Sequence, residues 1–364
     1  MKKLNWKSIL GWGIAALVAG FIVYTNMQGQ KALQESGKRN VYAVLPLSGV
    51  LTEIGKSMKD IMTEWQKVHP DALFNIQYID SQSRPDAALS ALNQATMYDE
   101  HPVVLTALST IGNVLSPIIK QKNGFGFGVF TLPLKENLGN YQRVSNSIED
   151  YMPSLIRHLK TLSTLAVIYI EDDYGVLAST ELIKRYTANG GKITNKIALD
   201  LKQKDVRIEV EKVLQNNPEG VVVIGMTTLA YINTFRELGI RGYKGEILSD
   251  YALALPYIQK AIGPYMENTF LSVLELKKDR ENEVTIAVNN ANTTFHHMPA
   301  EVWDTLDLIQ YTLEHNLPFT QETYTKMGKW KGVAGDVIFP GNGDSLYPFI
   351  LVQYKNGKFV PVEN

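Results

Sequence analysis

Short apolar runs alternate with amphipathic windows along most of this chain. In the first part, the runs that read as buried strands are residues 41–45, 74–79, 103–107 and 126–130. Helical periodicity separates them, near residues 54–69, 85–98 and 113–122. Pro85 suits a first helical turn, and Ser83 is a possible cap just before it. Strands and helices that alternate at this spacing predict βαβ units and a parallel sheet.

The same rhythm then restarts without a close sequence repeat. Strand-like runs cover residues 165–170, 192–198, 220–225 and 246–248. The helical windows between them lie near residues 177–189, 206–215 and 230–238. We therefore expect two α/β halves of similar length.

The last third of the chain has a different order of elements. A strand at 269–276 precedes three helical windows, at 281–295, 300–314 and 320–329. Three strand-like runs follow, at 337–339, 349–354 and 359–362. Asn356-Gly357 predicts a two-residue hairpin with a type I′ turn. The helices placed after the second half predict that the chain returns to the first half before it ends.

The N-terminal segment has the pattern of an export signal. Three lysines (residues 2, 3 and 7) precede an uncharged apolar run at 9–24, and a polar linker follows at 31–40. The run would be about 24 Å long as a helix, slightly short of a bilayer core of about 30 Å. Met27 and Gly29 make a poor cleavage site. We expect residues 1–30 to form an uncleaved signal anchor helix, with secretion after cleavage as the alternative.

Composition narrows the classes of chemistry. The chain has 364 residues, 36 Lys+Arg against 37 Asp+Glu, and 45% hydrophobic residues, which favours about two globular domains. The near-zero net charge gives no reason to expect a nucleic-acid partner. Without cysteine there is no thiol nucleophile, zinc ribbon, iron–sulfur cluster or lipid-anchor cysteine. Retention at the membrane would therefore depend on residues 9–24.

No catalytic motif emerges from the sequence. It has no Gly-x-Gly-x-x-Gly after a strand, no phosphate-binding Gly-x-x-x-x-Gly-Lys-Ser/Thr and no Gly-x-Ser-x-Gly elbow. His296 and His297 are adjacent, a poor arrangement for one metal ion. Helix capping explains the acidic pair Asp172-Asp173 as well as acid/base chemistry does. We expect no enzyme activity, no cofactor and no metal site.

Polar side chains instead gather just past the ends of the predicted strands. In open α/β sheets, ligands bind at the carboxyl ends of the strands, beside helix N-termini that favour anions. Both halves offer such a rim, which makes the series a candidate ligand site. Its members are Ser48, Ser109, Thr110, Thr131, Tyr174, Thr227 and Asp250.

Five segments in this order resemble the branched-chain amino acid/amide-type solute-binding proteins of ABC transporters, which have the type I periplasmic binding fold. The segment 45–55 opens with Pro46-Leu47-Ser48-Gly49, and 78–91 contains an Asp-x-x-Ser-x-Pro-x-x-Ala pattern. The segment 168–175 ends on Tyr174-Gly175, and 301–309 lies where the family has its Tyr-Asp-Ala helix. Residues 332–344 match the family's glycine-rich tail. The resemblance runs from about residue 41 to 362.

The resemblance implies two Rossmann-like lobes with mainly parallel central sheets, joined by three crossovers. It assigns residues 41–146 to the first part of lobe 1 and 147–273 to the main part of lobe 2. Residues 274–337 would return to lobe 1, and 338–364 would form C-terminal strands of lobe 2 and the hinge. A small ligand would be enclosed between the lobes by a hinge motion.

By the same resemblance, Ser109 and Thr110 would hold a ligand carboxylate, with Thr131 near the next contact. Tyr174 and Asp250 would complete the site from lobe 2, the acid facing a ligand ammonium group. Two aromatic positions of amino-acid binders are Ile54 and Thr227 (or its neighbour Met226) here. An amino acid, an amide and a small organic acid therefore all stay open as ligands.

The resemblance favours an extracytoplasmic solute-binding protein that feeds an ABC permease in the inner membrane. The alternative is a membrane-anchored ligand-sensing or partner-binding module with the same fold, which the predicted anchor favours. An enzyme on a doubly wound fold is the least favoured hypothesis.

Overall fold

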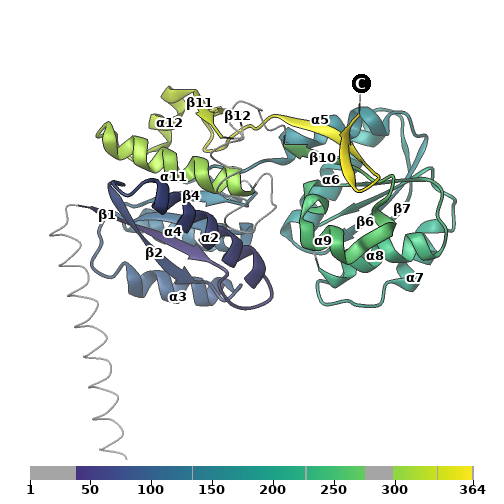
Figure 1. The fold of residues 1–364 in the computed structure, drawn as a ribbon, viewed down its shortest axis with the longest axis horizontal. Helices are drawn as coiled ribbons and strands as arrows, with labels where there is room; N and C mark the ends of the chain where they lie inside the picture. The colour runs from purple at the N-terminus through teal and green to yellow at the C-terminus, as the bar shows by residue number, and fades with distance from the viewer. Residues whose placement is uncertain (1–37, 133, 226–227, 275–297, 334, 363–364) are drawn as a thin grey trace, which may run out of the picture.

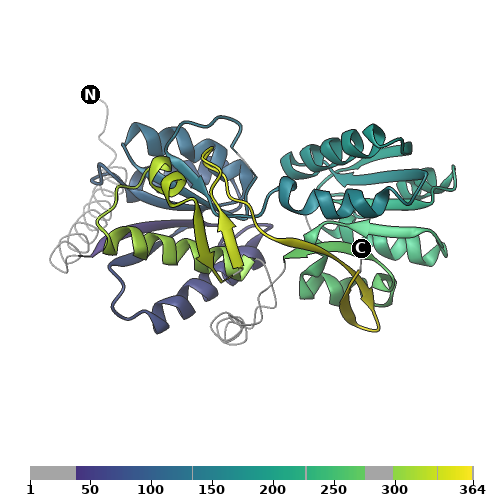
Figure 2. The same ribbon diagram turned by 90° about the horizontal axis from the view of Figure 1, so that it is seen from above.

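Two α/β lobes lie side by side in the computed structural model, which describes residues 38–132, 134–225, 228–274, 298–333 and 335–362. Figures 1 and 2 show that the first lobe combines the beginning of the chain with helices from near its end. The second lobe is formed by the middle of the chain and the C-terminal strands. The predicted α/β architecture of two lobes with mainly parallel sheets is confirmed.

The first lobe is built on a five-stranded parallel sheet in the order β2-β1-β3-β4-β5. Its strands are β1 (Arg39–Leu45), β2 (Phe74–Asp80), β3 (Val103–Ala107), β4 (Phe125–Val129) and β5 (Tyr141–Arg143). The helices between them are α2 (Thr52–Val68), α3 (Pro85–Ala95) and α4 (Ser109–Gln121). Every residue of β3 and β4 is buried, as expected for strands covered on both faces.

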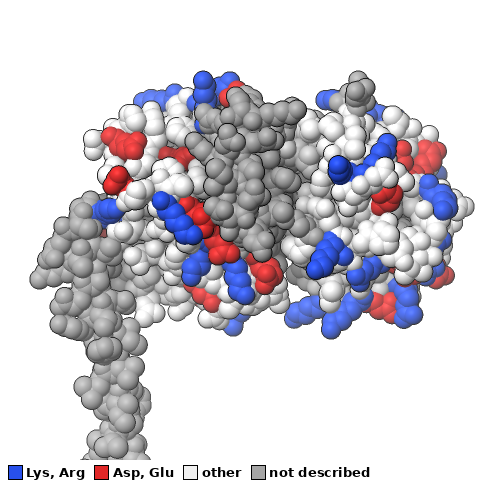
Figure 3. All heavy atoms as spheres, viewed as in Figure 1, with Lys and Arg blue, Asp and Glu red and all other residues white. Residues whose placement is uncertain are grey.

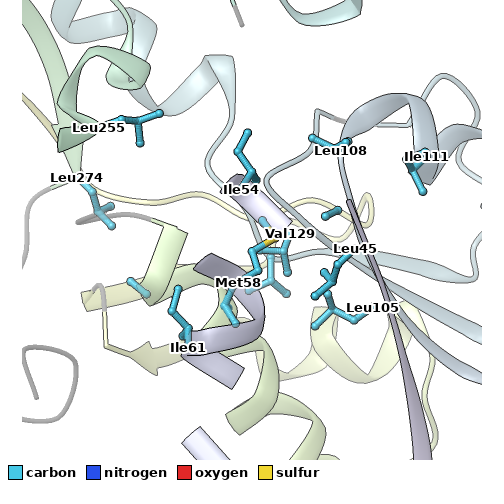
Figure 4. Close-up of a cluster of buried hydrophobic side chains, with 14 of the residues drawn as sticks. Leu45, Ile54, Met58, Ile61, Leu105, Leu108, Ile111, Val129, Leu255 and Leu274 are labelled. Atoms are coloured by element: carbon cyan, nitrogen blue, oxygen red, sulfur yellow. The ribbon is translucent and has the colours of Figure 1, made fainter. Parts of the chain in front are cut away.

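The chain returns to this lobe near its end. The returning elements are α11 (Met298–Glu314), α12 (Gln321–Met327), β11 (Lys329–Gly332) and β12 (Gly335–Ile338), the last two forming a separate hairpin. Helix α11 packs on α2, where the Trp65 indole N–H donates to the Asp307 carboxylate at 2.7 Å. Figure 4 shows the core beneath, with Leu45, Leu105 and Val129 from three neighbouring strands beside Met58 of α2.

The second lobe has a seven-stranded sheet in the order β14-β13-β10-β9-β8-β6-β7. Its strands are β6 (Thr164–Ile170), β7 (Lys192–Leu199), β8 (Gly220–Ile224), β9 (Glu246–Ser249), β10 (Phe270–Leu274), β13 (Phe349–Lys355) and β14 (Lys358–Pro361). The strands β6 to β10 are parallel, whereas β13 and β14 are added antiparallel at one edge. Its helices are α5 (Ile148–Leu159), α6 (Asp173–Ala188), α7 (Arg207–Leu214), α8 (Leu229–Ile240) and α9 (Pro256–Ile262), with 3₁₀ turns η1 (Tyr251–Ala254) and η2 (Gly263–Met266).

The chain passes between the lobes after β5 and again between β12 and β13, the second passage visible in Figure 2. Residues 275–297, which connect β10 to α11, lie outside the described residues, and so does the helix expected at 281–295. The expected apolar helix at 9–24 also lies outside them. Among the helices that are described, none is long and apolar enough to span a bilayer.

Two local predictions can be compared directly with the structure. Asn356 and Gly357 have φ values of 51° and 77°, which confirms the type I′ hairpin turn. The helix expected at 320–329 ends earlier, because Gly328 takes a φ of 67° and Lys329 already begins β11. Strands β5 and β11 and helices α5 and α9 were not predicted.

Candidate functional site

A helix without a side-chain cap begins at the carboxyl ends of the first-lobe strands. Helix α4 begins directly after β3, and its N-cap residue Leu108 makes no side-chain capping hydrogen bond. Leu108 has a φ of 76°, and Phe130 at the end of the neighbouring β4 has a φ of 52°. Such values are unusual for non-glycine residues and cluster at functional sites. The first N–H groups of α4 are therefore available to an anion.

Ser109 and Thr110, two predicted site residues, form the first turn of this helix. The Ser109 Oγ accepts the Leu132 N–H at 3.0 Å, so its own proton remains available to a ligand. Thr110 is exposed. Thr131 lies in the adjacent loop, but it is buried and its hydroxyl donates to the Leu132 carbonyl at 2.9 Å. Ser109 is thus the best-placed hydroxyl donor of the three.

Ser48 lies at the end of β1 in a separate set of contacts. Its hydroxyl donates to one oxygen of Asp80 at 2.6 Å, and its N–H donates to the other at 3.0 Å. Both Ser48 and its partner are near the surface. These bonds hold the β1–α2 turn against the end of β2. Thr227 lies outside the described residues.

Helices α6 and α8 and the turn η1 of the second lobe begin with side-chain acceptors in place, whereas α7 and α9 do not. The Asp172 carboxylate caps α6 by accepting the Gly175 N–H at 2.6 Å. Thr228 caps α8, and Asp250 caps the turn η1 by accepting the Ala252 N–H at 3.0 Å. An anionic ligand group would therefore meet acceptors in this lobe and free donors at α4 of the other.

Tyr174 and Asp250, predicted to lie together, are in direct contact. The Tyr174 hydroxyl donates to Asp250 Oδ2 at 2.8 Å, and the same oxygen accepts the Gly225 N–H at 3.2 Å. Asp250 is fully buried, and burial raises the pKa of its carboxyl to about 7. The Tyr151 hydroxyl lies 3.0 Å from that of Tyr174, so the two phenols and Asp250 form a row of hydrogen-bonded groups.

An aromatic cluster surrounds this chain of hydroxyls. The ring of Tyr251 lies 5.5 Å from that of Tyr151, 6.1 Å from Tyr174 and 6.3 Å from Phe349. Phe130 reaches the same ring from the first lobe, with centroids 6.5 Å apart. Sequence reasoning missed Tyr151, Phe130 and Phe349. Of the rings in this cluster that were not predicted as site residues, only Tyr251 could have been found from the sequence, because it follows Asp250 at the end of a predicted strand.

A second contact between the lobes lies beside this cluster. Lys135, in the loop after β4, pairs with Asp173 at the start of α6 at 3.3 Å. Both side chains are solvent-accessible, so the pair contributes little energy. It nevertheless shows that the rim of one lobe reaches the helix N-terminus of the other.

Buried charge gathers where the chain leaves the first lobe. The Arg143 guanidinium pairs with Asp344 and donates from Nη1 to the carbonyls of Thr131 (2.8 Å) and Asn146 (2.7 Å). Glu301 of α11 accepts the Asn146 N–H at 2.7 Å and the Ser145 hydroxyl at 3.2 Å. Burial raises the pKa of Glu301 to about 7. This network fixes the crossover from both sides.

The Asn146 amide lies at the same crossover, beside Tyr251. It lowers the pKa of the Tyr251 hydroxyl, against the larger raising effect of burial. The side chain is buried, and neither its oxygen nor its nitrogen has a hydrogen bond of ordinary geometry to any described residue. A buried amide without a hydrogen bond of ordinary geometry is unusual in folded proteins.

The described surface carries both charge signs, intermixed over the two lobes, as Figure 3 shows for one face. Within the part of the chain that the structure covers, no group of three His, Asp or Glu side chains is placed to hold a metal ion. The groups that the structure brings together at the site are hydroxyls, backbone N–H groups, one amide, aromatic rings and the Asp250 carboxyl.

Comparison with known proteins identifies the class. The family model for periplasmic binding proteins matches residues 43–357, so the chain belongs to this family, whose members bind ligands outside the cytoplasm. No curated protein sequence matches the chain.

Solved structures share its fold at low sequence identity. The leucine binding protein of Thermotoga maritima is 14% identical with a TM-score of 0.75, covering 89% of this chain and 98% of its own. The branched-chain amino acid transporter substrate binding protein of Streptococcus pneumoniae, in complex with isoleucine, is 11% identical with a TM-score of 0.77, covering 88% and 97%. A solute binding protein of an ABC transporter from R. palustris, in complex with benzoate, is 13% identical with a TM-score of 0.76, covering 90% and 96%.

Proposed function

We propose that this protein binds a small carboxylate-bearing solute between its lobes and delivers it to an ABC permease. The observation that carries the proposal is the contrast between the two rims. Helix α4 of the first lobe begins without a side-chain cap and presents Ser109 and Thr110, whereas α6, α8 and η1 of the second lobe are capped internally. Family membership supports the transport role.

In this proposal, the ligand carboxylate accepts hydrogen bonds from the first turn of α4 and from the Ser109 hydroxyl. Charge-assisted hydrogen bonds of this kind are stronger than neutral ones, particularly when closure removes water. The body of the ligand rests against the second lobe near Tyr174 and Tyr251. Ser48 and Thr131, which already bond within the protein, hold the turns that shape the rim.

A ligand screen followed by one substitution tests this assignment. The full chain is screened by thermal shift against amino acids, amides and small carboxylates, and the hit is titrated calorimetrically. Ser109→Ala is expected to weaken binding about 10-fold or more, since a hydrogen bond to a charged group contributes about 1.5–3 kcal/mol. Ser90→Ala, an exposed serine on α3, is the matched control. Equal affinities for the two variants would contradict the assignment.

We also propose that residues 9–24 tether the protein to the membrane. The support is the apolar run after three lysines and the lack of a cysteine that could carry a lipid. A tethered protein suits the second candidate function, a sensor or partner-binding module, as well as import. Mass spectrometry of the N-terminus from membrane fractions should find residues 1–30 intact, whereas a mature start near residue 30 would contradict the tether.

A further inference from the structure

Asp250, the acid of the second-lobe site, already accepts hydrogen bonds from groups of the protein. Asp250 accepts from the Tyr174 hydroxyl and the Gly225 N–H on one oxygen, and from the Ala252 N–H on the other. A carboxylate accepts about four hydrogen bonds, so three of its positions are filled. The residue is also fully buried. A ligand ammonium group would have to displace these donors to reach it.

The direction of the hydroxyl chain follows from this contact. Tyr174 has one hydroxyl proton, and the 2.8 Å bond to Asp250 uses it. In the 3.0 Å contact between the two phenols, Tyr151 therefore donates to Tyr174. Burial raises the pKa of both phenols well above their usual value, so both stay neutral. Asp250 thus orients two tyrosines instead of offering a free charge.

The surface that these tyrosines support is aromatic. Tyr251 contacts both of them and also Phe349, with centroid distances between 5.5 and 6.3 Å. Phe130 of the first lobe approaches the same ring and directly follows β4, the strand next to the one that leads into α4. Aromatic rings favour edge-to-face and offset contact with another ring. The rings and the open end of α4 therefore border the same interlobe region.

We infer that the ligand is an aromatic monocarboxylate without an ammonium group, held by its carboxylate at α4 and by its ring against the Tyr151–Tyr174–Tyr251 cluster. Asp250 is then a positioning residue that holds Tyr174 and, through it, Tyr151. The inference rests on the proposed function and specifies the ligand class of the same site. Asn146, whose side-chain amide lies against the Tyr251 hydroxyl, is part of the neighbouring rim.

Calorimetric titration of the full chain with benzoate and with L-leucine tests the inference. Benzoate should bind and raise the melting temperature, and L-leucine at equal concentration should leave both readouts unchanged. Benzylamine, which carries the ring and a cation but no carboxylate, should also fail to bind. Binding of L-leucine in preference to benzoate would overturn the inference and leave the proposed function standing. Failure of every member of the wider solute panel would overturn both.

Variants at the hydroxyl chain separate positioning from direct contact. Tyr174→Phe removes the donor to Asp250, and Tyr151→Phe is the matched change one step further along. A positioning role predicts that Tyr174→Phe weakens benzoate binding by less than 10-fold, with the pH dependence of binding altered, whereas Tyr151→Phe leaves that pH dependence closer to wild type. If Asp250 contacted a ligand ammonium group instead, Tyr174→Phe would free its carboxylate. L-Leucine would then bind more tightly to the variant, and benzoate would not bind. That result would overturn the inference without requiring Asp250 itself to be replaced.

Discussion

At the scale of single residues, two buried acids position the groups that lie between the lobes, and both have hydrogen-bond partners within the protein. Asp250 caps a turn and orients Tyr174, whereas Glu301 holds the crossover through Ser145 and Asn146. Burial dominates in both cases and raises each pKa to about 7. A carboxyl group with a raised pKa binds its proton more tightly in the folded state than in the unfolded chain. Its contribution to stability therefore falls as the pH rises.

Glu301→Gln should reduce the pH dependence of folding. Glutamine keeps an acceptor oxygen for the Asn146 N–H and cannot ionise. The stabilising contribution of Glu301 is complete below the unfolded pKa, near 4.5, and is lost as the pH rises through about 7. Urea unfolding between about pH 5 and pH 8 should show a loss of stability that is smaller in the variant by about 1 kcal/mol or more.

The control is Glu314→Gln, an exposed acid at the end of the same helix. It should keep the wild-type pH profile. Asp250 and Asp150, whose carboxyl pKa values burial also raises to about 7, leave part of the slope in every variant. Identical slopes for wild type and Glu301→Gln would show that Glu301 is not the group that titrates.

At the scale of elements, the sequence predicted β3, β4 and β8 because their runs are mostly apolar and every residue in them is buried. It missed β5, which is only three residues long and contains Gln142 and Arg143. It also missed α5, which contains Pro153 and spans the passage into the second lobe, although Ser147 and Asp150 form a capping box at its start. These two elements lie at the crossover, where tertiary contacts decide the conformation. Helix α9 and strand β11 were also missed and lie elsewhere in the two lobes.

The candidate site could also be predicted only in part. Its strand-end positions followed from the general geometry of α/β sheets, and Tyr174 does lie against Asp250. The aromatic cluster could not be predicted, because Phe130, Tyr151 and Phe349 come from three distant elements. Nor does a sequence pattern show that a carboxylate already accepts three hydrogen bonds from backbone and phenol donors. That information exists only in the folded arrangement.

At the scale of the whole molecule, two lobes meet along a rim that includes the Phe130–Tyr251 contact and the Lys135–Asp173 pair. The chain passes between the lobes beside a buried network in which Arg143 pairs with Asp344 and donates to the carbonyls of Thr131 and Asn146. Binding of a solute between the lobes would favour the closed population, as in other hinged proteins. The extent of the shift depends on the difference in affinity of the two states for the ligand.

The most direct test of this account measures the distance between the lobes with and without ligand. The natural chain has no cysteine, so spin labels attach only where Lys56→Cys on α2 and Lys260→Cys on α9 introduce one. A pair within the first lobe, Lys56→Cys with Ser90→Cys, is the control. Saturating benzoate should shorten and narrow the interlobe distance distribution and leave the control unchanged. An interlobe distribution that stays the same with every solute that binds would contradict the two-lobe clamp.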